Sequence, residues 1–148
     1  MSGHILVPVD GSEHSFRALE VACSLAKAES KKIRLLHVVP NKDIPEALKR
    51  FAQVEHIQES PELLYESGVA ENVLNTARDQ AAAIGASDVE SAVEHGEASK
   101  GILAAASEGD VDTIVMGTRG LSDIQGLVLG SVAHKVAHGA DCRVIAVK

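Results

Sequence analysis

The sequence has 148 residues, with 14 Lys and Arg against 21 Asp and Glu, giving a formal net charge of −7. This length fits a single domain over residues 1–148, and an apolar content of 45% excludes intrinsic disorder. Aromatic residues make up only 2% of the chain. The acidic balance and the scarcity of stacking side chains argue against nucleic-acid binding, which needs a basic face and aromatic platforms.

The amino terminus and the two cysteines indicate a reduced, cytoplasmic protein. The apolar run over residues 5–9 is interrupted at Asp10 and follows no basic segment, so it predicts neither a secretory signal nor a membrane span. Cys23 and Cys142 lie far apart and outside any C-x-x-C pattern. A disulfide scaffold or zinc ribbon is therefore not expected, and both thiols are interpreted as structural.

The first third of the chain predicts a strand, a helix and a second strand. Residues 4–9 are continuously apolar, as in a strand covered on both faces, with Pro8 near the end of pairing. Asp10 and Gly11 then form a turn, and Ser12 is a plausible N-cap for a helix over about residues 12–29. The mostly apolar residues 33–39 predict the second strand, which Pro40 ends.

The middle of the chain is harder to interpret. Ile44, Leu48 and Phe51 suggest a short helix within residues 41–61. A long helix is predicted over about residues 70–84, with Gly85 as its C′ residue. Residues 89–95 alternate between apolar and polar side chains, which is typical of a third strand at the edge of a sheet.

The last third predicts two more helices and two more strands. An apolar helical stripe over residues 98–106 predicts a helix that ends at Gly109, and residues 113–117 predict a buried strand. Residues 131–138 predict a short helix closed by Gly139, and residues 143–148 predict the fifth strand. Alternating strands and helices predict a three-layer α/β/α sandwich around a five-stranded, mostly parallel sheet with right-handed crossovers. Ligands of such sheets bind beyond the carboxyl ends of the strands, at the switch point.

A glycine-rich loop lies between the fourth strand and the following helix. It contains Gly117, Gly120, Gly126 and Gly130. Glycine permits positive φ and close approach of a ligand, and the unpaired amides of the helix that begins at Ser131 favour an anion such as a phosphate. Ser131 can add a hydroxyl, and Arg119 or Ser122 can close over the phosphates. The competing interpretation is that these glycines only make turns, since the chain has no Walker A motif and no G-x-G.

The spacing of Gly117, Gly120, Gly130 and Ser131 resembles that of the ATP-binding branch of the universal stress protein family. The first strand with Pro8-Val9-Asp10, the LHVV of the second strand and the GSVAHKVAH helix match the family in the same order, over nearly the whole chain. The resemblance implies a Rossmann-like nucleotide-binding fold of the adenine nucleotide alpha hydrolase type. It also implies ATP, with or without Mg²⁺, as the bound cofactor.

The resemblance further implies the residues of the ATP site. Asp10 and the backbone near Pro8 and Val38 hold adenine, and Val38 and Met116 are an aliphatic pair suited to the two sides of the ring. The whole implied set is Pro8, Val9, Asp10, Val38, Met116, Gly117, Thr118, Arg119, Gly120, Leu121, Ser122, Gly130, Ser131 and Val132. Two other roles stay open for Asp10, namely capping the following helix and binding Mg²⁺ that accompanies the triphosphate.

These residues are compatible with more than one function. The leading hypothesis is a stress-response regulator or sensor whose ATP occupancy alters the surface seen by a protein partner, for example a membrane transporter or an enzyme. No catalytic residue is expected and hydrolysis is at most slow, because the glycine motif contains no Glu or His to act as a general base. The alternatives are a nucleotide-free dimeric scaffold and a phosphoacceptor receiver-type domain, although the acidic cluster of a receiver is missing.

Two further features bear on assembly and metals. The family resemblance implies a homodimer or higher homo-oligomer through the C-terminal strand, where Arg143 stands in place of the proline that many members have. Its backbone keeps a donor that proline lacks. His134 and His138 have the i, i+4 spacing that can chelate a metal, but a solvated or structural pair is the favoured interpretation.

Overall fold

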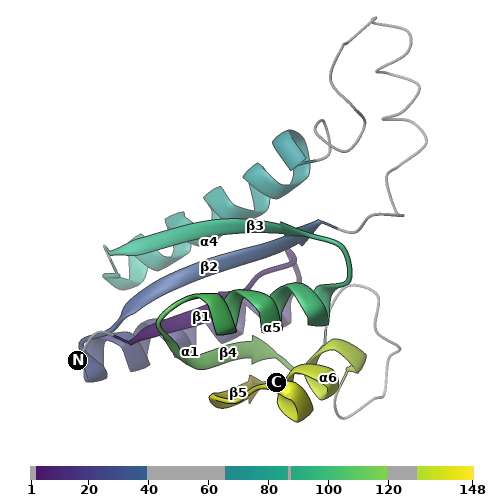
Figure 1. The fold of residues 1–148 in the computed structure, drawn as a ribbon. Helices are drawn as coiled ribbons and strands as arrows, with labels where there is room; N and C mark the ends of the chain where they lie inside the picture. Colours follow the sequence, from purple (N-terminus) through teal and green to yellow (C-terminus); the bar gives the residue numbers. More distant parts are fainter. Residues whose placement is uncertain (1–2, 40–65, 87, 120–129) are drawn as a thin grey trace, which may run out of the picture.

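The computed structural model describes residues 3–39, 66–86, 88–119 and 130–148. The elements in chain order are β1 (His4–Pro8), α1 (Glu13–Glu29), β2 (Lys32–Val39), the π-helical turn η1 (Glu66–Ala70), α4 (Glu71–Ile84), β3 (Val89–His95), α5 (Ala98–Glu108), β4 (Val111–Gly117), α6 (Ser131–Gly139) and β5 (Arg143–Val147). They form one sheet between helices, as the alternating pattern predicts (Figure 1). None of the described helices is both long and apolar enough to cross a membrane.

The strand order is β3-β2-β1-β4-β5, and every neighbouring pair is parallel. The chain therefore runs outward from β1 through β2 to β3, then returns to the other side of β1 for β4 and β5. The direction of winding reverses between β1 and β4, which is the switch point where open parallel sheets bind ligands. This is the order of dinucleotide-binding sheets, whereas receiver domains use the order 2-1-3-4-5. The receiver-type alternative does not fit this topology.

Side chains of alternating strand positions enter two separate cores. Ile5, Val7 and Leu35 face α1 and α4, where they pack with Leu19 and Leu74. The intervening positions face α5 and α6. Leu6, Leu36 and Ile114 form the second core there with Ile102 and Val136. The inner strands thus place apolar side chains on both faces, as their largely hydrophobic runs predict.

The predicted element ends are largely confirmed. Pro8 is the last residue of β1, Ser12 is the N-cap of α1, and Gly85 follows α4 with a φ of 103°. β3 lies at one edge of the sheet, as its alternation predicts. Gly139 is one difference: it is the last residue of α6, and Ala140 takes the C-cap position. The predicted short helix around Ile44, Leu48 and Phe51 lies outside the described residues.

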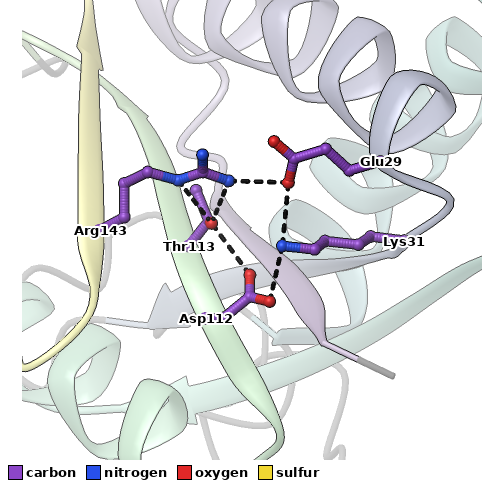
Figure 2. Close-up of polar contacts among 5 residues, drawn as sticks. All are labelled: Glu29, Lys31, Asp112, Thr113 and Arg143. Carbon is purple, nitrogen blue, oxygen red and sulfur yellow. Dashed lines mark hydrogen bonds and ion pairs between the residues drawn. The ribbon is translucent and has the colours of Figure 1, made fainter. Parts of the chain in front are cut away.

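At the amino ends of the strands, β5 is tied to α1 by a chain of polar contacts (Figure 2). Arg143 donates from Nε and Nη2 to Thr113 Oγ1, at 3.0 and 2.8 Å, and from Nη2 to Glu29 Oε1 at 2.9 Å. Thr113 in turn donates to Asp112 Oδ1, and Lys31 Nζ lies within 3.0 Å of both Glu29 and Asp112. The side chain of Arg143 therefore anchors this edge strand. This role is separate from the backbone N–H that Arg143 keeps and proline would lack.

Candidate functional site at the carboxyl edge of the sheet

The exit of β1 is a tight turn closed by side chain to backbone hydrogen bonds. The Ser12 amide donates to Asp10 Oδ1 at 2.8 Å, and Gly11 between them has a φ of 87°, which favours glycine. Ser12 Oγ then accepts from the Ser15 amide at 3.2 Å and caps α1. The capping role that stayed open for Asp10 thus belongs to Ser12. Asp10 shapes the turn, and its carboxylate is held at the carboxyl end of β1.

A buried histidine supports the same turn from β2. His37 is 5% exposed, and its Nδ1 lies 2.9 Å from the Val9 carbonyl oxygen. Because a carbonyl oxygen only accepts, Nδ1 carries the proton and donates. The Val9 amide also donates to Leu36 O at 2.8 Å, so both backbone polar groups of Val9 are bonded to β2. The sequence signal for this role was a single polar residue inside the apolar run LLHVV.

The end of β4 packs directly against α1. A Cβ atom on Gly117 would lie 2.7 Å from His14 Cβ and 2.9 Å from the His14 carbonyl carbon, which leaves no space for a side chain. Thr118 Oγ1 lies 3.5 Å from His14 Nδ1, and the Thr118 amide donates to Val147 O. Gly117 is therefore required by helix packing, a reason that the loop motif alone did not reveal.

The start of α6 lies beside the end of β4. The Gly130 amide donates to the Thr118 carbonyl oxygen, which joins the two ends of the glycine-rich loop. Gly130 is the N-cap of α6, has an ordinary φ of −67° and provides no side-chain cap. The first-turn amides of α6 thus receive no cap from the side chain of their own N-cap residue, and they carry the positive end of the helix dipole. Gly130 does not adopt a positive φ. What glycine offers at this position is the lack of a side chain, which leaves the α6 amides accessible.

Two aliphatic side chains flank the end of β1 on one face of the sheet. Val38 in β2 and Met116 in β4 both belong to the core beneath α5 and α6. Leu36 pairs with Pro8, so β2 continues for three residues past the end of β1, which places Val38 beside the exit turn. Gly101 of α5 covers Val38, and its Cβ would come within 3.1 Å of Val38 Cγ2. These side chains can supply apolar walls for a flat ring.

An ion-pair cluster joins α5 to α6 on the same side of the sheet. Glu97, the residue before α5, accepts from Ser99 Oγ at 2.8 Å and lies 3.0 Å from Lys135 Nζ of α6 and 3.7 Å from Lys100 Nζ. The hydrogen bonds from Ser99 and Lys135 lower the pKa of Glu97 below its ordinary value, so it stays ionised. Sequence reasoning missed this cluster because its members come from two helices and show no common motif.

The structure brings most of the implied site residues to one edge of the sheet. These are Pro8, Val9 and Asp10 after β1, Val38 in β2, Met116, Gly117, Thr118 and Arg119 at the end of β4, and Gly130, Ser131 and Val132 at the start of α6. Gly120, Leu121, Ser122 and Gly126 lie outside the described residues. Arg119, the last residue described before that gap, is half-buried.

The arrangement offers groups that suit a phosphate and an apolar ring. Backbone amides free of capping side chains suit phosphates, and the apolar pair Val38 and Met116 suits a base. In the described part of the chain, no group of three or more His, Cys, Asp or Glu side chains is placed to hold a metal. A divalent cation here would thus depend on the phosphate oxygens and water, with Asp10 as the carboxylate at hand. His134 and His138 stack as exposed rings on α6, with centroids 6.1 Å apart.

Comparisons with known proteins agree with this fold. Residues 1–148 match the Universal stress protein family. Universal stress protein YxiE of Bacillus subtilis is 34% identical over 151 residues, which cover 100% of both chains. Universal stress protein UspA from Lactobacillus plantarum has a TM-score of 0.79 at 24% identity, covering 99% of this chain and 97% of its own.

Some of the similar solved structures contain a bound nucleotide. One of them is a universal stress protein in complex with cAMP, 27% identical, with a TM-score of 0.71 and coverage of 99% of this chain and 96% of its own. The match to the family spans the whole chain, and the five-stranded parallel sheet between helices is the fold class that was expected. This chain therefore belongs to the universal stress protein family.

Proposed function

We propose that this chain is an ATP-binding stress-response regulator whose nucleotide occupancy changes its interaction with a protein partner. The observation that carries the proposal is the meeting of three features at the switch point: the β1 exit turn, the Val38 and Met116 pair, and the uncapped start of α6. A family relative bound to cAMP supports an adenine nucleotide as the ligand. A transporter or an enzyme is the kind of partner that we expect.

In this proposal each part of ATP has its own place. Adenine lies between Val38 and Met116 and is recognised by Asp10 and by backbone groups near Pro8 and Val38. The ribose and phosphates follow residues 116–122, and the amides of Gly130, Ser131 and Val132 hold the phosphate end. Mg²⁺ accompanies the triphosphate and is held by phosphate oxygens and water, because Asp10 lies at the adenine in this arrangement.

Hydrolysis is at most slow in this proposal. A water attacking the terminal phosphate needs a group that orients it and accepts its proton. At the described carboxyl edge, Asp10 is engaged by the Ser12 amide, and Glu97 is engaged by Ser99 and Lys135. Bound ATP then acts as a signal rather than as a substrate.

We place the homodimer contact at β5. This strand lies at the edge of the sheet opposite β3, so no strand of the described part of the chain pairs with its outer backbone groups. Such an edge is a ready surface for pairing with a second copy. Light scattering coupled to size exclusion tests the assembly, and a mass of one chain across the concentration range contradicts it.

Isothermal titration calorimetry tests the nucleotide proposal. Wild-type protein should bind ATP with a Kd in the micromolar range, equivalent to roughly 8 kcal/mol of binding free energy. Gly130→Val should abolish binding, because the side chain would occupy the space where the phosphates approach the α6 amides. Gly68→Val is the matched control, because a Cβ there meets no atom of the described residues within 4 Å. Wild-type protein that binds no adenine nucleotide would contradict the proposal and favour the nucleotide-free scaffold.

A further inference from the structure

A lysine of α6 is held by a carboxylate that has other partners. Lys135 Nζ lies 3.0 Å from Glu97 Oε1, and both side chains are exposed to solvent. Glu97 also accepts from Ser99 Oγ at 2.8 Å and lies 3.7 Å from Lys100 Nζ. If Lys135 leaves, the carboxylate keeps Ser99, Lys100 and the positive end of the α5 dipole. Moving Lys135 away therefore does not leave the Glu97 carboxylate without a partner.

The position of Lys135 relates it to the start of α6. Lys135 and Ser131 are four residues apart in the same helix, so their side chains lie on one face, one turn apart. Side chains in a helix lean toward its amino end, so Lys135 leans toward Ser131 and the uncapped amides beside it. Both residues are exposed, and neither must break a packed core to meet a ligand there.

The charge of the chain gives this lysine its importance. With a net charge of −7, the molecule as a whole repels a polyanion, so phosphates must be held by local groups. Backbone amides and the helix dipole supply only partial charges at the start of α6. Among the described residues, Arg119 and Lys135 are the full cations nearest to the ends of the glycine-rich loop in sequence.

We propose that Lys135 leaves Glu97 for the distal phosphates of a bound nucleotide, so that the site prefers adenosine triphosphate to the monophosphate. This inference rests on the proposed function. It adds that the affinity of the site depends on how many phosphates the nucleotide carries. Glu97 opposes binding by holding Lys135 in the empty protein. The pair thus sets how strongly the protein distinguishes ATP from AMP.

Calorimetry with ATP and with AMP on four proteins tests this role. Lys135→Gln should weaken ATP binding by about tenfold, the range for loss of a charged hydrogen bond, and change AMP binding by less than about twofold. Glu97→Gln should strengthen ATP binding severalfold, because Lys135 is then released. Lys100→Gln is the matched control, since Lys100 contacts the same carboxylate from α5. It should leave ATP affinity within about twofold of the wild type.

The outcomes separate this inference from the proposed function. Wild-type protein that binds neither nucleotide overturns both. Wild-type protein that binds ATP, with an unchanged ATP affinity in Lys135→Gln, overturns only the role of Lys135. Equal weakening of ATP and AMP by Lys135→Gln also overturns it, because a structural effect would not depend on phosphate number. Thermal unfolding of each variant confirms that the exposed substitutions leave the fold intact.

Discussion

At the scale of single residues, the turn after β1 is fixed by hydrogen bonds from side chains to the backbone. Asp10, Ser12 and Ser15 hold it from within, and His37 holds the Val9 carbonyl from the neighbouring strand. The motif of glycines and the Asp10 position were visible in the sequence. The His37 contact was not, because its partner is a backbone atom 28 positions away in the chain.

The contact between His37 and Val9 can be tested by substitution. His37→Phe should lower the free energy of unfolding by about 1–3 kcal/mol, because it leaves the Val9 carbonyl oxygen without its side-chain donor in a buried place. His37→Asn, whose amide nitrogen can replace Nδ1 as donor, should recover part of the loss. Urea unfolding measures both. Equal stability of the Phe variant and the wild type would show that this hydrogen bond does not contribute.

At the scale of elements, the sequence pattern predicted the fold well because each strand and helix has its own periodicity and caps. The apolar runs of β1, β2 and β4, the Ser12 cap and the Gly85 end all correspond to observed features. Contacts between elements were less predictable. The clash at Gly117 with α1 and the cluster at Glu97 depend on how helices lie on the sheet, which no local pattern encodes.

Packing of α1 on β4 makes Gly117 sensitive to any side chain. Gly117→Ala should lower the free energy of unfolding by about 1–3 kcal/mol, since its Cβ would press on backbone atoms of His14 that cannot move aside. Gly68→Ala, where the added Cβ has open space, is the control and should not destabilise the protein. Thermal unfolding distinguishes the two. A fully stable Gly117→Ala would contradict the close approach of α1 and β4.

The contact between α1 and β5 through Glu29 predicts a pH dependence. Hydrogen bonds from Arg143 and from Lys31 lower the pKa of Glu29 from its ordinary value of 4.5 to about 2. A carboxylate whose pKa is lower in the folded state stabilises that state above its unfolded pKa and loses this effect as the pH falls through the folded value. The contribution of Glu29 is therefore present above about pH 4.5 and is lost between about pH 4.5 and pH 2.

Glu29→Gln measures this contribution. The variant should be less stable than the wild type at pH 7, and the difference should shrink steadily as the pH is lowered from 4.5 toward 2. Glu13→Gln is the control, because Glu13 is exposed and its ion pair with Arg17 spans 3.8 Å within α1. A stability difference that stays constant over this pH range would show that the link between α1 and β5 acts without the charge of Glu29.

At the scale of the whole molecule, the topology decides where chemistry takes place. Because winding reverses between β1 and β4, the ends of β1, β2 and β4 and the start of α6 share one edge of the sheet. The polar network of Glu29, Lys31, Asp112, Thr113 and Arg143 lies at the opposite edge, where it secures β5 (Figure 2). The carboxyl ends of the strands thus carry the proposed ligand site, and the amino ends carry the polar contacts that hold β5 in place.

Nuclear magnetic resonance of the labelled protein titrated with ATP locates the nucleotide site. We expect amide shifts to concentrate at Asp10, Val38, residues 116–119 and residues 130–132, at the carboxyl ends of the strands. Amides near Glu29, Asp112 and Arg143 should serve as the internal reference and stay unchanged. The absence of any ATP-dependent shift, or shifts concentrated around those reference residues, would contradict a nucleotide site at the switch point between β1 and β4.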